Sequence, residues 1–224
     1  YYPEWIEPIK TNYKGYDIYE IPPNGHGITV LMALNILENF EEINLHFQIE
    51  SLKLAFADTK KYVADIKYMQ TSIKEMLSKE YSKKRAKLIS INKTLQPKEN
   101  IFSSGDTVYL ATADKDGNMV SFIQSNYTAF GSGIVIPKTG IALHNRGANF
   151  SLDRKSDNFI APRKKPYHTI IPGFLCKDNK PIGAFGVMGA FMQPQGHLQI
   201  LTNMIDENLN PQSSLDKPRW QWVG

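Results

Sequence analysis

Thr107 stands where a nucleophile could be placed. The stretch SSGDTVYLATADKDGN (103–118) starts as a polar run, and an alternating strand opens abruptly at Thr107. A threonine hydroxyl is a weak nucleophile that needs a base. A threonine also suits the start of a strand through its β propensity, and the residues by themselves favour that structural interpretation.

The other residues that could do chemistry are scattered. No H-x-x-x-H pair, G-x-S-x-G elbow or P-loop is present, and Cys176 is the only cysteine. We therefore expect no metal site, no other cofactor and no intrachain disulfide. The five histidines lie far apart in the sequence: His26, His46, His144, His168 and His197.

Composition is that of an ordinary globular protein. Of the 224 residues, 42% are hydrophobic and 21% are charged, and the net charge is +4. This small, dispersed excess argues against a nucleic-acid partner. No apolar run is long enough to span a membrane, so we expect no membrane partner either. The absence of a signal peptide and the single cysteine favour a cytoplasmic location.

The first half of the chain is predicted to be mainly helical. Residues 13–25 alternate and end in Pro-Pro-Asn-Gly, which indicates a strand followed by a loop. Residues 27–40 form an apolar helix. A helix starting near 42 places Leu45, Ile49, Leu52 and Phe56 on one face. A further helix covers 72–89, with Ile73, Met76, Leu77 and Leu88 facing inward.

The second half is predicted to be richer in strands. A polar, Pro- and Gly-broken stretch at 90–106 separates the halves. Asp116-Gly117 is a strong hairpin signal. Helices, then strands, then a helix indicate a mixed, layered α+β domain. Strands are expected at 107–113, 119–126, 133–136, 140–144, 168–175 and 181–187, with a last helix at 194–208.

Longer strings, read together, resemble the γ-glutamyltranspeptidase family of N-terminal nucleophile hydrolases. They are PPNGHGITVLMALNILENF, HFQIESLKLAFAD, YVAD, LSKEY, DTVYLATADKDGN, FGSGIVIPKTGIALHNRGANFSLD and QPQGHLQILTNMIDENLNPQSSLDKPRW. FGVMG followed by FMQPQGH is similar to the bacterial and archaeal transpeptidase-like branch. The resemblance covers nearly the whole chain.

The resemblance implies a four-layer αββα sandwich made by a precursor that cuts itself. Residues 1–106 match the end of the family's large subunit and 107–224 match most of its small subunit, together one domain. Thr107 aligns with the family's new N-terminal threonine, so the cut would fall between Asp106 and Thr107. The freed α-amino group, with an ordinary pKa of about 7.7–8.0, would then be the base for the Thr107 hydroxyl.

Other roles follow from the same alignment. Gly189 and Ala190 match a Gly-Gly pair whose N–H groups bind the oxyanion. Ser125 matches a hydroxyl residue that supports the nucleophile, and Asn126 lies one position from a family asparagine. For both, the resemblance alone implies the role.

Substrate binding is where the chain departs from the family. Asn149 in GANF stands where the family has an aspartate for the substrate's α-amino group. His168 and Thr169 replace two serines that hold the α-carboxylate. Family acylases that cleave glutaryl-type side chains also lack that aspartate. The family's carboxylate-binding arginine belongs to a large-subunit segment outside this sequence.

These matches predict a γ-glutamyltransferase-like amidohydrolase or acyltransferase acting on a small γ-glutamyl amide. A glutaryl-type acylase is the alternative. A further alternative is a catalytically inactive relative, or an inert fragment, with a binding or assembly role. We expect the remaining segments of the parent protein, or a second chain, as partners in a homo- or hetero-oligomer.

Overall fold

The computed structural model describes residues 3–97 and 106–223. None of the helices in these residues is long and apolar enough to cross a membrane. The elements, in chain order, are β1 (Ile9–Tyr13), β2 (Tyr16–Glu20), α1 (Gly27–Leu37), α2 (Leu45–Tyr62), η1 (Ile66–Tyr68), α3 (Ile73–Met76), α4 (Lys79–Ala86), β3 (Asp106–Ala113), β4 (Met119–Tyr127), η2 (Arg146–Asn149), β5 (Gly173–Lys177), β6 (Lys180–Phe185), α5 (Met192–Ile205) and α6 (Pro211–Asp216).

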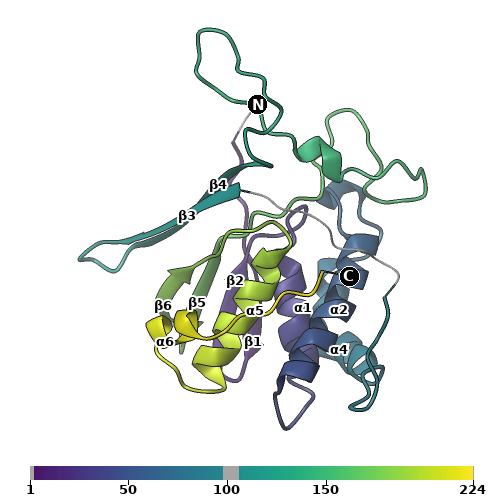
Figure 1. The fold of residues 1–224 in the computed structure, drawn as a ribbon, viewed down its shortest axis with the longest axis vertical. Coiled ribbons are helices and arrows are strands. Elements are labelled where there is room, and N and C mark those ends of the chain that lie inside the picture. The colour runs from purple at the N-terminus through teal and green to yellow at the C-terminus, as the bar shows by residue number, and fades with distance from the viewer. Residues whose placement is uncertain (1–2, 98–105, 224) are drawn as a thin grey trace.

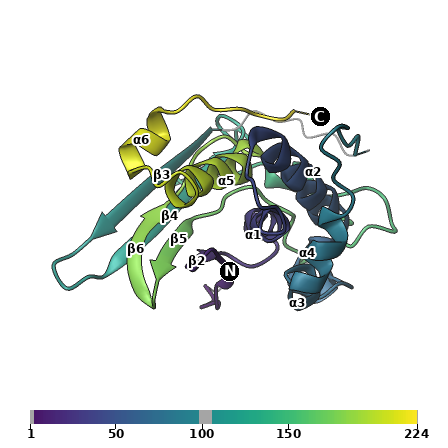
Figure 2. The same ribbon diagram turned by 90° about the horizontal axis from the view of Figure 1, so that it is seen from below.

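The larger sheet joins the two ends of the chain. Its antiparallel strands run in the order β1-β2-β5-β6, and β2 pairs with β5 from Tyr16↔Lys177 to Tyr19↔Phe174. Helices α1 and α5 lie over one face of this sheet, and α2 packs beside α1 (Figures 1 and 2). The predicted α+β class is confirmed.

The core lies between the sheet and its helices. Every residue of α1 is buried, because sheet, α2 and α5 surround it. Ile18 of β2 and Leu175 of β5 point toward the helices. The alternating positions Tyr19, Phe174 and Cys176 are only half-buried and line a shallow apolar pocket with Pro172. In the described part of the chain no helix or strand covers this second face (Figure 2).

A second, two-stranded sheet carries Thr107. Strands β3 and β4 form a ribbon that extends away from the helices (Figure 1), closed by the predicted turn at Asp114–Asn118. The inner face of the ribbon is anchored on β5, since the Ser121 hydroxyl donates to the Gly173 carbonyl at 2.9 Å. The outer face carries the exposed apolar residues Val108, Leu110, Val120 and Phe122.

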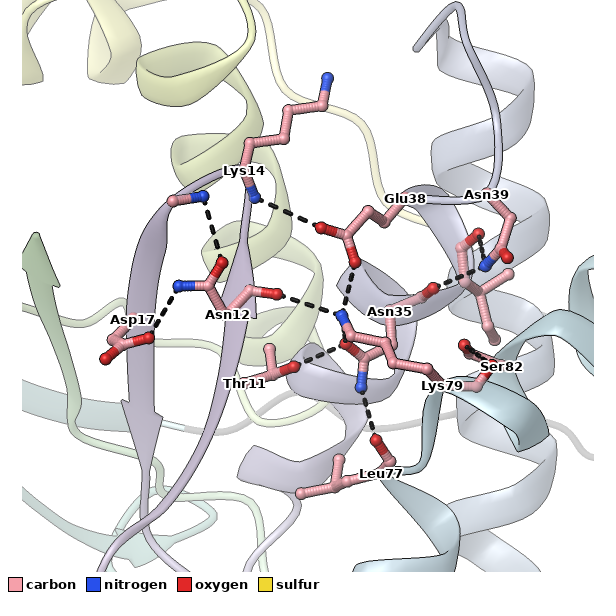
Figure 3. Close-up of polar contacts among 12 residues, drawn as sticks. Thr11, Asn12, Lys14, Asp17, Asn35, Glu38, Asn39, Leu77, Lys79 and Ser82 are labelled. Carbon is pink, nitrogen blue, oxygen red and sulfur yellow. Dashed lines mark hydrogen bonds and ion pairs between the residues drawn. The ribbon is translucent and has the colours of Figure 1, made fainter.

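A polar network fastens the β1–β2 hairpin to the helices (Figure 3). The buried Asn35 of α1 accepts from Thr11 of β1 and from the Lys79 ammonium at the start of α4. Its amide group donates to the Leu77 carbonyl. Lys79 also pairs with Glu38. One side chain thus joins three elements that are distant in sequence.

Several sequence predictions were wrong in detail. The strand expected from residue 13 is the second strand of a hairpin, because Lys14 and Gly15 both adopt positive φ and turn the chain. The helix expected at 72–89 is two short helices, because the Ser78 side chain caps a new helix. Leu88 lies beyond α4 and is exposed.

The strands predicted after the ribbon are shorter or absent. Residues 133–136 and 140–144 form no regular strand: they share one isolated bridge, Val135↔Ala142, and backbone hydrogen bonds from Ile136 to Ile141 and from Leu143 to Ile134. Strand β5 begins at Gly173, and His168 makes only a bridge to Gly25. Leu45 is exposed because it is the first residue of α2. Helix α6 was not predicted. Within the polar stretch at 90–106, residues 98–105 lie outside the described residues.

Candidate active site

Thr107 lies opposite Ser125 and Asn126 across a β-bulge. Asp106 pairs with Tyr127 and Val108 pairs with Gln124, so two residues of β4 face the single Thr107 of β3. Bulges of this kind re-aim side chains and are common beside active sites. The Ser125 hydroxyl accepts a hydrogen bond from the Tyr127 N–H at 2.8 Å. The bulge in the ribbon therefore brings together three residues that were predicted to belong to the site: Thr107, Ser125 and Asn126.

These three residues line one pocket of about 560 Å³. Its mostly polar lining distinguishes it from the apolar pocket between β6, α5 and α6. Met188 completes its wall from the loop that precedes α5. The remaining lining residues are Val108, Gln124, Ala129 and Ala142.

Gly189 and Ala190 follow Met188 directly and lead into the N-terminus of α5. Both have positive φ, +116° and +50°. Neither N–H group has an acceptor among the described residues, while their carbonyls accept from Met192 and Gln193. Two N–H groups at a helix N-terminus are suited to an oxyanion. Where the family has a second glycine, the Ala190 backbone adopts the left-handed region that favours glycine, and its methyl group is buried.

Asn149 ends the short helix η2 and is held by Tyr127. The Tyr127 hydroxyl donates to Asn149 Oδ1 at 2.9 Å, and the Asn158 amide donates to the Asn149 carbonyl at 2.7 Å. Asn149 Nδ2 is buried without a hydrogen-bond partner in the described chain. The atom that Asn149 leaves available is therefore a donor, which suits an anion better than an ammonium group.

Arg146 begins the same short helix and was not singled out from the sequence. Its side chain is buried, Nη2 donates to the Ser125 carbonyl at 3.0 Å, and the guanidinium lies over the Tyr127 ring. Burial lowers its pKa from the ordinary value for arginine. The neighbouring Asn145 also holds β4, since its N–H donates to the Asn126 carbonyl.

His168 and Thr169 interact with different residues. Burial lowers the pKa of His168 to about 3, with further lowering by the charges of Arg146 and His144. His168 is therefore neutral at physiological pH and electrostatically close to Arg146. Thr169 is buried, and its carbonyl contacts Nε2 of His26 at 2.8 Å. The structure brings His168 near Arg146, while the Thr169 carbonyl contacts His26.

The roles assigned from the sequence stay predictions. The arrangement groups Thr107 with Ser125 and Asn126, and Asn149 with Arg146. The side chain of Asp106 lies outside the described residues. No group of three or more His, Cys, Asp or Glu in residues 3–97 and 106–223 is arranged to hold a metal ion. Arg146 was missed because nothing in the local pattern HNRGANF indicates burial, and Tyr127 was not singled out from the sequence either.

Comparisons with known proteins agree on one family. The family model described as gamma-glutamyltranspeptidase matches residues 1–223. The glutathione hydrolase-like YwrD proenzyme of Bacillus subtilis is 39% identical over 227 residues, which covers 98% of this chain and 43% of that protein. The oxamate amidohydrolase proenzyme of Klebsiella pneumoniae is 31% identical over 219 residues, 95% of this chain and 41% of that protein.

A solved structure shares the fold. The crystal structure of a cephalosporin acylase from Bacillus halodurans is 55% identical, with a TM-score of 0.90, over 99% of this chain and 42% of that chain. The present chain thus spans less than half the length of the relatives that it matches.

Proposed function

Because this chain belongs to the γ-glutamyltranspeptidase family, we propose that the complete protein is an N-terminal nucleophile amidohydrolase or acyltransferase with Thr107 as its nucleophile. The observation that carries the proposal is the bulge that sets Thr107 against Ser125 and Asn126 in one polar pocket. The names hydrolase, amidohydrolase and acylase among the relatives support an amide-cleaving reaction.

The first step in this proposal is self-cleavage. The Thr107 hydroxyl attacks the carbonyl carbon of Asp106, and the acyl group moves from the Thr107 nitrogen to its oxygen. This shift frees the α-amino group of Thr107, and water then hydrolyses the ester, which releases the Asp106 carboxylate and restores the Thr107 hydroxyl. The proenzyme names of the relatives support such a maturation.

The mature site would repeat this chemistry on a substrate. The α-amino group of Thr107 takes the hydroxyl proton as the oxygen attacks the amide, and later returns a proton to the leaving amine. Water or an acceptor amine then removes the acyl group. The N–H groups of Gly189 and Ala190 are the candidate oxyanion donors, worth a factor of about 10²–10³ each.

The acyl group is proposed to be γ-glutamyl or glutaryl. The hydrogen bond from Tyr127 to Asn149 Oδ1 favours the glutaryl type, because that oxygen is already occupied and no carboxylate replaces it. A glutaryl group has no α-ammonium that needs such a partner. The cephalosporin acylase similarity supports the same choice.

The complete fold is proposed to be a four-layer αββα sandwich. The described residues supply a layer of helices on one face of a sheet, and the face with Tyr19, Phe174 and Cys176 remains open to a second sheet. The segments that this chain lacks relative to its relatives would complete it, from the same precursor or from a second chain, within a homo- or hetero-oligomer.

The test is maturation and activity of the complete protein. Wild type should give two pieces on SDS gels, and Edman sequencing of the smaller should begin Thr-Val-Tyr-Leu. Thr107→Ala should stay uncut and fail to hydrolyse glutaryl and γ-glutamyl p-nitroanilides. Thr112→Ala, an exposed threonine of the same strand, is the matched control and should be cut and active. Cleavage that persists in Thr107→Ala would refute self-processing. A wild-type protein that neither cuts nor hydrolyses would instead support the inactive-relative alternative.

A further inference from the structure

Among the described residues, Arg146 has no carboxylate partner. Its side chain is more than nine-tenths buried, with 5% exposure, and its Nη1 has no hydrogen-bond partner in this part of the chain. The Tyr127 ring lies under the guanidinium, with Arg146 Cζ 5.6 Å from the ring centroid. Buried charges are usually paired with an opposite charge, so a buried guanidinium whose partners among the described residues are a carbonyl and an aromatic ring is a marked exception.

Two further nitrogen atoms nearby lack partners. Asn149 Nδ2, from the same short helix, is buried and unsatisfied, and so is Nδ1 of His168. The other titratable groups that face Arg146 are His144, whose Nδ1 accepts from the Arg146 N–H at 3.2 Å, and His26. Burial lowers the pKa of all three histidines, with the charge of Arg146 as a further cause. The region is therefore cationic through Arg146 and rich in donors.

This region adjoins the pocket of Thr107. Arg146 Nη2 binds the carbonyl of Ser125, and the Ser125 residue lines that pocket. Tyr127 links the two donors, since its ring lies under the guanidinium and its hydroxyl holds Asn149. An anion bound by Arg146 would thus lie beside the Ser125 segment of β4, which lines the pocket of Thr107.

We propose that Arg146 and Asn149 form the receptor for a carboxylate on the acyl part of the substrate. The proposal rests on the function proposed above. The substrate class is then a monoamide of a short dicarboxylic acid, with its amide carbonyl at Thr107 and its free carboxylate at Arg146 Nη1 and Asn149 Nδ2. Asparagine suits this position because an aspartate would repel the carboxylate.

The experiment compares two anilides in the complete protein. Glutaryl and pentanoyl p-nitroanilide have the same acyl chain length, and only the first carries a carboxylate. Arg146→Met should lower kcat/KM for the glutaryl substrate by about 10- to 150-fold, the range for a hydrogen bond to a charged group, and change the pentanoyl value by less than about threefold. Arg154→Met, an exposed arginine nearby, should change neither.

An equal loss on both anilides, or no loss on the glutaryl one, would overturn the proposal. If Arg146→Met does not fold, Arg146→Lys replaces it, because lysine keeps the charge but not the planar fork. Its loss should again fall on the glutaryl substrate, and an equal effect on both substrates would refute the assignment.

A binding measurement separates this proposal from the catalytic one. Calorimetry on the processed wild-type protein should detect binding of glutarate, which has no amide to cleave, but not of pentanoate, and Arg146→Met should abolish it. Glutarate binding that is unchanged in Arg146→Met would overturn the receptor, as would its absence in the parent, which means that a carboxylate of the protein itself occupies Arg146. Hydrolysis by Thr107→Ala would refute only the nucleophile.

Discussion

Replacing His197 should destabilise the protein by leaving a buried carboxylate without its partner. His197 Nδ1 lies 2.7 Å from Glu20 Oε1, and both side chains are fully buried between β2 and α5. Burial raises the pKa of Glu20, and His197 opposes that rise. His197→Leu keeps an apolar side chain against Phe185, so we expect the electrostatic loss to dominate, at about 3–5 kcal/mol of unfolding free energy.

The loss should depend on pH in a definite direction. The folded-state pKa of Glu20 lies above its unfolded value, so the folded chain binds more protons between the two pKa values and stability falls as pH rises there. Without His197 the folded-state pKa of Glu20 rises further, so the pH range over which stability falls extends to higher pH. One proton accounts for at most about 1.4 kcal/mol per pH unit, so between about pH 5.5 and about pH 8 the loss can grow by about 3 kcal/mol.

The assay is urea unfolding of the complete protein at both pH values, with each variant compared with wild type. Leu198→Ala, also fully buried in α5, is the control: it should cost about 2–5 kcal/mol independently of pH. His26 and Tyr109 interact electrostatically with the pair, but burial lowers the pKa of His26 well below 6.5 and raises the pKa of Tyr109 above its ordinary value of 10, so in the folded protein both stay neutral over the pH range compared. A His197→Leu loss as independent of pH as that of Leu198→Ala would refute the reasoning. So would a Glu20→Gln/His197→Leu double variant that keeps the pH dependence.

Three further outcomes are expected. Asn149→Asp should move the ratio of kcat/KM values toward γ-glutamyl over glutaryl p-nitroanilide by about 2- to 30-fold, because the new charge pairs with an α-ammonium and repels a carboxylate; an unmoved ratio would mean that Asn149 does not face the acyl group. Ala190→Gly should leave kcat/KM within about threefold, since a backbone N–H is the candidate donor and glycine accepts positive φ; a 100-fold loss would contradict this. The isolated 224-residue chain should associate in light scattering, because Val108 and Phe122 are exposed on the ribbon; a monodisperse, active monomer would contradict this.

Local signals predicted the hairpin on which part of the site lies, because Asp116-Gly117 marks the turn. Thr107, Ser125 and Asn126 were assigned from the family resemblance, and the bulge that sets them opposite one another was not predicted. The sequence predicted only the second strand of the first hairpin, because Lys-Gly is a weaker turn signal than Asp-Gly. In the structure Lys14 and Gly15 both adopt positive φ and form that turn.

Contacts between distant segments could not be predicted in this way. The position of the loop before α5, whose Met188 lines the pocket, depends on how α5 packs. The pairing of Tyr16 with Lys177 depends on the assembly of the whole sheet. The burial of Arg146 is the clearest case. Arginine is seldom fully buried, so a position in a polar loop predicts an exposed side chain. In the structure the Arg146 side chain is buried.

The pairing of β2 with β5 has a consequence for the order of folding and the proposed cleavage. It pairs residues on opposite sides of the Asp106–Thr107 bond. A piece ending at Asp106 would expose an open edge of β2, and a piece beginning at Thr107 would expose one of β5, and such edges recruit other chains. The proposed cut would therefore have to follow folding. It would also act as a checkpoint, because only a molecule in which β2 and β5 are already paired keeps its two pieces together after the bond is broken.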